Sequence, residues 1–195
     1  QEPFSNCPSL LRVDLSGCPK LESIPRLTFS NCHHLASVVF GEHSNITNLG
    51  PGAFGHCYAL TNITLPNNLE VIEHQTFSNC FSLKRVVFNN NLKTIGEGAF
   101  QYCSALKSVT LPDKLKFIDD TTLAFCTSLE RVVCNKNLKT IGGGAFQLCP
   151  KLEDVQLASK SISFGDNLFV GCDRMVEVAD AAGFPSKIGT RDDTG

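Results

Sequence analysis

The sequence lacks the features that mark several common functional classes. It has no excess of basic residues, since 17 Lys and Arg stand against 19 Asp and Glu and give a net charge of −2. This balance argues against a surface that neutralises the phosphates of a nucleic acid. The uncharged apolar runs are a few residues long, far short of the roughly 20 that a membrane-spanning helix needs. We therefore expect no nucleic-acid partner and no direct insertion into a membrane.

Motifs for catalysis, metal binding and cofactor binding are also missing. The sequence has no C-x-x-C pair and no G-x-S-x-G nucleophile motif, and its five histidines occupy different positions of the repeat described below. Residues 50–55 match G-x-G-x-x-G, but the same glycines return in residues 96–98 and 142–144. They belong to a repeated turn, in which a positive φ is easiest for glycine. We expect no catalytic residue, no metal and no cofactor.

A repeat organises what is present, and 42% of the residues are apolar, enough to bury a core. Eight of the ten cysteines are separated by intervals of 25, 25 and then five times 23 residues. A large apolar residue, usually Phe, stands three positions before each of them, and Leu or Met stands three positions after. A Val or Ile follows three positions later. The eight cysteines are Cys7, Cys32, Cys57, Cys80, Cys103, Cys126, Cys149 and Cys172.

The spacing of these columns predicts the shape of one unit. After the Val or Ile, the next apolar residue comes two positions later, as in a short strand that shows one face to a core. A return leg follows with pairs such as Leu92 and Ile95, and one unit cannot bury these residues alone. The pattern predicts a repeat solenoid, a right-handed stack of about eight 23-residue units. We expect short parallel strands on one face, and turns with short 3-10 or irregular segments on the other.

A longer period and two irregular ends complete the organisation. Residues 80–102 and 126–148 differ at only six of 23 positions, so units alternate in pairs of 46 residues and surface chemistry should recur at every second unit. The first two units carry extra residues after the strand, in residues 16–20 and 41–45, where we expect protruding loops. Asp180 interrupts the apolar column. We expect a solenoid domain over residues 1–178 and a cap or frayed tail over 179–195.

The string F-x-x-C-x-x-L-x-x-V-x-L-P-x-x-L-x-x-I-G-x-x-A-F resembles the BspA-like leucine-rich repeats, also called the Treponema pallidum type. The match covers residues 4–178 and is best from Phe54 to Phe146. The resemblance implies a leucine-rich-repeat fold, no catalytic residues, and a secreted or surface protein of a microbe, some relatives being adhesins for host matrix proteins. A cytoplasmic location is the alternative. Two N-x-T sequons, at Asn45 and Asn62, bear only slightly on this choice.

The cysteines have two interpretations. An even number of cysteines in a secreted protein suggests disulfides. Equivalent side chains of a solenoid point the same way, however, and parallel vectors disfavour the disulfide dihedral near 90°. We favour a ladder of reduced, buried thiols, in which Cys134 replaces Leu in a strand column and Cys18 is the exposed thiol of a loop.

The outward residues of the strands are the candidate binding surface. Charge is unevenly spread over them, with a basic middle formed by Lys84, Arg85, Lys107 and Arg131 and an acidic end formed by Glu153, Asp154 and Glu177. Arg85 and Arg131 share one repeat position two units apart, about 9.6 Å at the usual strand spacing. Two such guanidinium groups could pair with carboxylates or sulfates of an extended partner. The alternative is a merely solvated face, because exposed strands need some charge to resist aggregation.

Three functions compete at this point. The leading hypothesis is a non-enzymatic module that binds a protein or glycan partner through the sheet face, in adhesion or recognition, as a monomer. The second is a structural spacer whose repeats only set length within a larger surface protein. An enzyme ranks third, because Phe and Cys that recur in every unit are explained by the core alone.

Overall fold

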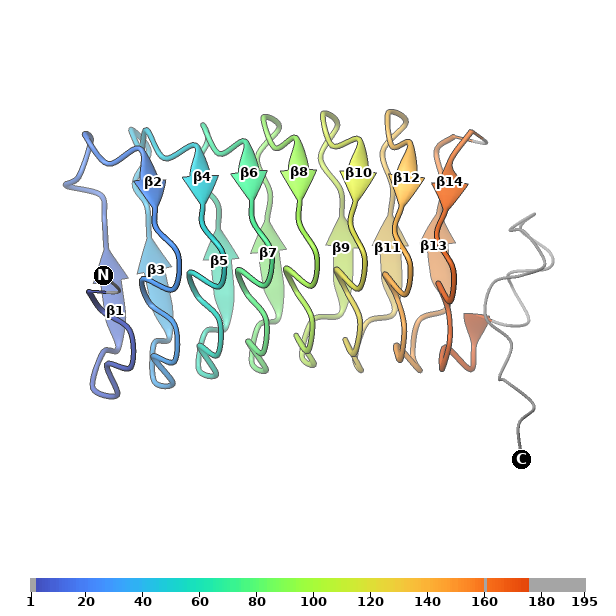
Figure 1. The fold of residues 1–195 in the computed structure, drawn as a ribbon, viewed down its shortest axis with the longest axis horizontal. Coiled ribbons are helices and arrows are strands. Elements are labelled where there is room, and N and C mark those ends of the chain that lie inside the picture. Colours follow the sequence, from blue (N-terminus) through green and yellow to red (C-terminus); the bar gives the residue numbers. More distant parts are fainter. Residues whose placement is uncertain (1–2, 160, 176–195) are drawn as a thin grey trace.

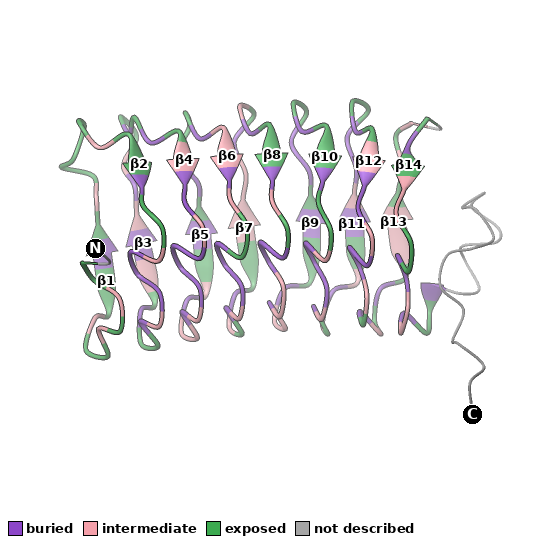
Figure 2. Ribbon diagram, viewed as in Figure 1, coloured by how far each residue is buried: buried purple, intermediate pink, exposed green. Residues whose placement is uncertain are grey.

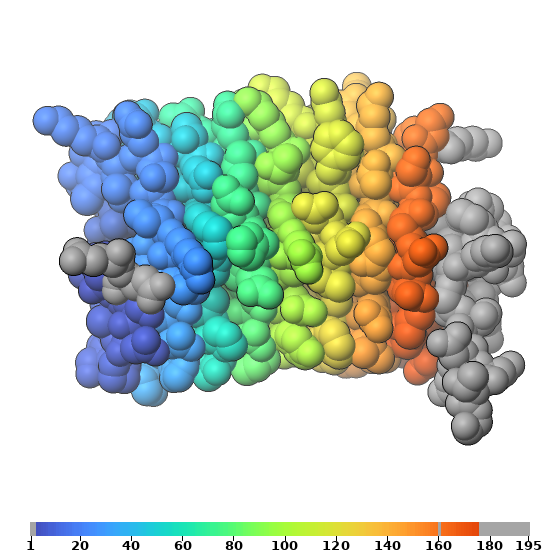
Figure 3. Space-filling model, viewed as in Figure 1, coloured from blue at the N-terminus to red at the C-terminus, as the bar shows by residue number. Residues whose placement is uncertain are grey.

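The structure is a computed structural model that describes residues 3–159 and 161–175. The chain winds seven times through a three-residue strand and a two-residue strand, and each such turn is called a rung below (Figure 1). The rungs lie side by side in sequence order, and Figure 3 shows them as successive bands along the molecule. This architecture confirms the predicted repeat solenoid. The expected cap at 179–195, with Asp180 and the boundary at 178, lies outside the described residues.

The three-residue strands carry the odd numbers. They are β1 (Arg12–Asp14), β3 (Ser37–Val39), β5 (Asn62–Thr64), β7 (Arg85–Val87), β9 (Ser108–Thr110), β11 (Arg131–Val133) and β13 (Asp154–Gln156). The central residue of each is the predicted Val or Ile of the core column, and most of these are buried. The first and third residues point outward because successive side chains of a strand alternate between its faces. The strand face predicted from the V-x-L step is therefore present in every rung.

The two-residue strands of the return legs carry the even numbers and lie in front of the odd strands in Figure 1. They are β2 (Ser23–Ile24), β4 (Asn48–Leu49), β6 (Val71–Ile72), β8 (Thr94–Ile95), β10 (Phe117–Ile118), β12 (Thr140–Ile141) and β14 (Ser163–Phe164). All seven pair in one continuous parallel sheet in chain order. The sequence led us to expect turns and irregular segments on this side, and the sheet replaces them because aligned rungs let each return leg satisfy its backbone on its neighbour.

The phenylalanines of the repeat form the centre of the core. Rings of adjacent rungs stack with centroids 5.3 Å apart from Phe29 to Phe54, 5.4 Å from Phe54 to Phe77 and 5.3 Å from Phe77 to Phe100. Leu123 takes the next position and interrupts the stack. Figure 2 shows the buried segments recurring at the same place in successive rungs. One unit has no such neighbours, so the core exists only through stacking.

The cysteines of the ladder are free, as the favoured interpretation predicted, and seven of the eight are buried, the exception being the partly buried Cys7. All ten cysteines are free, and Cys18 is exposed. Ladder thiols also act as donors: the Sγ of Cys80 donates to the carbonyl of Phe54 at 3.3 Å, and the Sγ of Cys103 donates to that of Phe77 at 3.3 Å. Burial raises the pKa of Cys80 to about 12. Each buried ladder thiol thus fills a small apolar position and donates to a carbonyl of the preceding rung.

The turns explain two other recurring residue types. The residue before each ladder cysteine has a positive φ, for example 61° at Asn79 and 62° at Tyr102. Gly98, with φ of 58°, fits the predicted role of glycine in the other turn. Gly142 is needed for a different reason, because a Cβ there would meet the backbone nitrogen of Asp120 at 2.5 Å. Of the two predicted loops, residues 16–20 are fully exposed, whereas Ser44 in the second loop is buried.

Candidate functional site

The odd strands do not form one sheet, unlike the even strands. They form three short sheets, with orders β1-β3, β5-β7 and β9-β11-β13. In the part of the chain that the structure describes, no ladder joins β3 to β5 or β7 to β9. The strand face is therefore interrupted at two places, which are two rungs apart.

The residue that follows each odd strand accounts for the interruptions. Where the strands pair, the N–H of this residue donates to the carbonyl of the third residue of the next strand, as in Leu65 to Val87 at 3.0 Å and Leu111 to Val133 at 2.9 Å. The residue is Phe at both interruptions, and among the described residues neither Phe40 nor Phe88 makes this bond. A bulkier side chain thus coincides with each missing bond.

The orientation of these two rings gives the physical reason. Phe40 packs edge-on against Phe54 of the next rung, with an interplanar angle of 88°, and Phe88 packs against Phe100 at 82°. The planes of the stacked core rings are perpendicular to the solenoid axis. The rings of Phe40 and Phe88 are nearly perpendicular to those core rings, so their planes run parallel to the axis. Such a ring occupies the space between two rungs and holds their strands too far apart to pair, since pairing requires about 4.8 Å.

On the C-terminal side of each interruption, a buried asparagine joins the next two rungs by a hydrogen bond. The Nδ2 of Asn89 donates to the carbonyl of Pro66 at 2.7 Å, and that of Asn135 donates to the carbonyl of Pro112 at 2.7 Å. In both cases the hydrogen bond joins a rung whose odd strand is followed by Leu-Pro, called an L-P rung below, to the rung that follows it. The rungs are thereby organised in blocks of two, which gives the 46-residue period of the sequence a structural basis.

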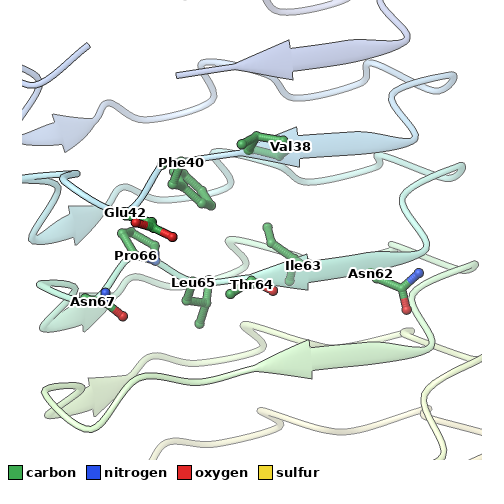
Figure 4. A pocket seen from close by; sticks show the side chains of 11 residues that line it. Val38, Phe40, Glu42, Asn62, Ile63, Thr64, Leu65, Pro66 and Asn67 are labelled. Carbon is green, nitrogen blue, oxygen red and sulfur yellow. The ribbon is translucent and has the colours of Figure 1, made fainter. Parts of the chain in front are cut away.

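The first groove lies between β3 and β5 and has a volume of about 390 Å³. Figure 4 shows Phe40 pointing from the end of β3 toward the rung of β5, where Leu65 and Pro66 form the opposite side. Glu42 lies at the end of the groove beside Pro66, and Asn62 lies at the start of β5 (Figure 4). An apolar floor with a few polar groups at its rim is the usual composition of a ligand site.

The second groove lies between β7 and β9 and has a volume of about 430 Å³. It repeats the apolar lining of the first, with Phe88, Leu111 and Pro112 in the places of Phe40, Leu65 and Pro66. Its polar rim differs, because Arg85 lines it at the beginning of β7 and Asp113 lines it beyond Pro112. The expectation that surface chemistry recurs at every second rung therefore holds for the apolar lining of the grooves and fails for their charge.

The predicted charged residues divide into free and paired groups. Lys84, Arg85 and Lys107 are exposed, and within residues 3–159 and 161–175 no carboxylate forms an ion pair with them. Arg85 and Ser108 line the second groove. The basic middle of the strand face is thus concentrated around this groove.

The remaining predicted residues are engaged with one another or with a neighbour. The Nε of Arg131 lies 2.6 Å from the Oδ2 of Asp154, and the Oε2 of Glu153 lies 2.7 Å from an Nη of Arg174. The register explains the first pair, because β11 and β13 align Arg131 with Asp154. Arg85 and Arg131 are therefore not equivalent, contrary to what their shared repeat position suggested. Glu177 lies outside the described residues.

The described part of the chain contains no cluster of three His, Cys, Asp or Glu side chains placed to hold a metal ion. It also contains no helix that could span a membrane. Sequence reasoning missed the two grooves, although the alternation of Phe and Leu after the strands was a visible signal of a two-rung period.

The chain is similar in fold to solved leucine-rich repeat proteins. The chain resembles a T. pallidum leucine-rich repeat protein (TpLRR), with 28% identity over 93% of this chain and 87% of that chain, and a TM-score of 0.84. It also resembles a leucine-rich repeat protein from Bacteroides ovatus, with 28% identity over 88% of this chain and 49% of the other, and a TM-score of 0.74. A leucine-rich repeat protein from Eubacterium ventriosum, 18% identical over 76% of this chain and 57% of the other, shares the fold with a TM-score of 0.61.

A search among curated proteins gives no match. The family model described as "BspA type Leucine rich repeat region (6 copies)" matches residues 1–57 and 47–176, which together cover most of the chain. Because this model covers more than half of the chain, the chain belongs to the BspA-type leucine-rich repeat family.

Proposed function

We propose that the chain is a non-enzymatic interaction module that binds a protein or glycan partner on the face of the odd strands. The observation that carries this proposal is the second groove, between β7 and β9, in which apolar side chains such as Phe88 lie beside polar and charged ones such as Ser108 and Arg85. A solvated face that only resists aggregation needs charge but needs no groove. A groove that combines apolar side chains with a few polar groups is typical of recognition.

Charge supports the same surface. Lys84, Arg85 and Lys107 carry positive charge without an ion-pair partner in the described residues, and each is next to or part of the second groove. Unpaired cations beside a groove attract an acidic partner and accelerate its association. The paired residues Arg131, Asp154 and Glu153 contribute less to this attraction because their charges are already compensated. They form the far end of the proposed surface.

Family membership supports a location at the cell surface or outside the cell, where a binding module of this kind meets its partner. We propose that the chain acts there as a monomer. The alternative is a structural spacer, and the strand face distinguishes the two, because a spacer has no use for the grooves.

Binding to an array of matrix proteins and glycans tests the proposal. The parent protein should bind at least one array member, and Arg85→Ala with Lys107→Ala should weaken that binding at least tenfold. The matched control is Lys20→Ala with Arg26→Ala, which removes two exposed charges away from the grooves. Equal binding by parent and groove variant would exclude this surface, and the absence of any binding would favour the spacer.

A further inference from the structure

A second basic region lies at the turns that lead from the odd strands to the even strands. The position before each even strand is occupied in successive rungs by Glu22, Thr47, Glu70, Lys93, Lys116, Lys139 and Ile162. The parallel register aligns Thr94 with Phe117 and Phe117 with Thr140, so the three lysines before them occupy consecutive rungs. The N–H of Lys139 donates to the carbonyl of Lys116 at 2.8 Å, which fixes their backbones next to each other.

These lysines line a cleft of about 480 Å³, called the lysine cleft below. Its lining consists of Lys93, Asp113, Lys114, Lys116, Asn137 and Lys139. Four lysines against one aspartate leave three positive charges. The exposed lining of the cleft is mostly apolar, so the aliphatic stems of the lysines form its walls and their charges lie around it. Like charges on neighbouring strands destabilise a sheet when nothing compensates them.

The four lysines differ in whether a neighbouring side chain interacts with their ammonium group. The Nζ of Lys93 lies 2.6 Å from a carboxylate oxygen of Glu70, and the Nζ of Lys114 donates to the Oδ1 of Asn91 at 2.8 Å. Lys116 and Lys139 have no ion pair or side-chain hydrogen bond in the described part of the chain. Two ammonium groups on adjacent rungs are therefore available for an anionic ligand.

An exposed aromatic ring adjoins the same row. Phe117 follows Lys116 directly and is 47% exposed, on the outer side of β10. Its partners in the sheet are Thr94 and Thr140, which are much smaller. A large ring that stands out between two threonines offers a flat apolar surface beside the charges.

We propose that the lysine cleft and Phe117 bind a linear polysaccharide that carries carboxylate or sulfate groups, lying along the solenoid axis. Rungs advance by about 4.8 Å, a distance comparable to the length of one sugar unit, so consecutive anionic units meet consecutive lysines. The C–H face of one sugar packs on Phe117. The ammonium group of lysine is a compact charge that needs no fixed geometry from its anion, and so it accepts either group.

The spacing disfavours an extended acidic peptide at the same site. Side chains on one face of a strand recur every second residue, about 6.8 Å apart, which does not match the lysine row. This polysaccharide site differs from the strand-face site in its lysines, which precede the even strands, although the two sites share Asp113 in the turn between β9 and β10.

Calorimetric titration of the whole chain with defined ligands tests the proposal. The ligands are a sulfated heparin oligosaccharide, a carboxylate-only oligogalacturonate, a neutral dextran oligosaccharide and a poly-glutamate peptide. We expect one or both acidic saccharides to bind, with weakening at higher salt, and dextran and poly-glutamate to bind at least tenfold more weakly. Lys116→Gln with Lys139→Gln should lower the affinity for the acidic saccharide at least tenfold.

Two further variants make the result specific. Phe117→Thr copies its neighbours in the sheet and should weaken saccharide binding severalfold without changing its salt dependence. Lys20→Gln with Arg26→Gln removes two exposed positive charges that line neither the grooves nor the lysine cleft and should leave saccharide binding unchanged. The proposal is overturned if no acidic saccharide binds, if the two double variants lose equal affinity, or if poly-glutamate binds as tightly as the saccharides. Unchanged urea midpoints of all variants would show that the fold is intact.

Discussion

Two boundaries between rungs, made from closely similar sequence, have opposite structures. Between β7 and β9 the strand ladder is missing and a groove of about 430 Å³ opens. Between β11 and β13 the ladder is complete, and the N–H of Cys134 donates to the carbonyl of Gln156 at 2.9 Å. The position of Cys134 corresponds to that of Phe88, one of only six differences between residues 80–102 and 126–148. The boundary that follows Phe88 is grooved and the boundary that follows Cys134 is closed, and we expect the side chain at this position to cause the difference.

Removing the aromatic support below the open boundary should have the largest effect. Phe100 is buried, stacks on Phe77 and meets Phe88 edge-on. Phe100→Ala should lower the free energy of unfolding by about 3–5 kcal/mol, the usual cost of removing a buried ring. Urea midpoints at equal m-value measure this loss. Phe81→Ala is the control, because Phe81 is 42% exposed and should cost less than half as much. Equal losses would contradict the assigned core.

Cys134→Phe should open the closed boundary. The ring would need the space between the rungs, and overpacking of this kind costs about 1–3 kcal/mol. The ladder from β11 to β13 should separate, so the amide of residue 134 and those of β13 should exchange hydrogen faster with solvent. Cys134→Leu is the matched control, because Leu occupies this position at paired boundaries such as Leu65 and Leu111. A protected ladder in the Phe variant would show that the ring is not the cause.

Phe88→Cys should close the open boundary. Loss of the half-buried ring destabilises the fold, and new hydrogen bonds between β7 and β9, each worth about 1 kcal/mol, offset part of that loss. We expect a net decrease of about 1–2 kcal/mol in the free energy of unfolding. Hydrogen exchange of the β9 amides should slow, and a crystal structure should lack the second groove. Phe88→Tyr retains the ring and should retain the groove, and amides of β9 that exchange equally fast in both variants would argue against the prediction.

The smallest effect concerns the two arginines at these boundaries. Arg131 pairs with Asp154 at the closed boundary, whereas Arg85 has no such partner among the described residues. The pair is partly exposed, so Arg131→Gln should cost less than about 1 kcal/mol, and high salt should remove the difference from the parent. Arg85→Gln should leave the urea midpoint unchanged at any salt concentration. A larger cost for Arg85→Gln would mean that it too has a structural role.

Much of the fold could be predicted from the sequence because each core position is repeated eight times. The Phe, Cys and Val columns identified the core and the three-residue strands, and the equal direction of repeated side chains predicted free thiols. The even-strand sheet could not be predicted in the same way. Each of its strands has two residues, as in Thr94–Ile95, and two residues are too few to show the alternation that distinguishes a strand from a turn.

The candidate site could not be predicted from the sequence, because it depends on contacts between rungs and the repeat pattern describes only the residues within one rung. The grooves result from a backbone bond that Phe40 and Phe88 fail to make, and the pairing of Arg131 results from the register of β13. The alternation of Phe and Leu was visible, but only the perpendicular rings show why it separates strands. The row of Lys93, Lys116 and Lys139 was also visible as three equal positions, and its significance depends on the cleft that they share.

The asparagine that ties each L-P rung to its successor limits how such a molecule can grow by gene duplication. Asn89 reaches back to Pro66 and Asn135 reaches back to Pro112, so the fastening has a direction and joins rungs two at a time. A duplication of 23 residues would place two rungs of the same type in contact and leave an asparagine or a proline carbonyl without its partner. A duplication of 46 residues would preserve every fastening and add one further groove at the same interval. Lineages that lengthen this solenoid should therefore do so in even numbers of rungs, and each such step multiplies the apolar recesses available to a long partner.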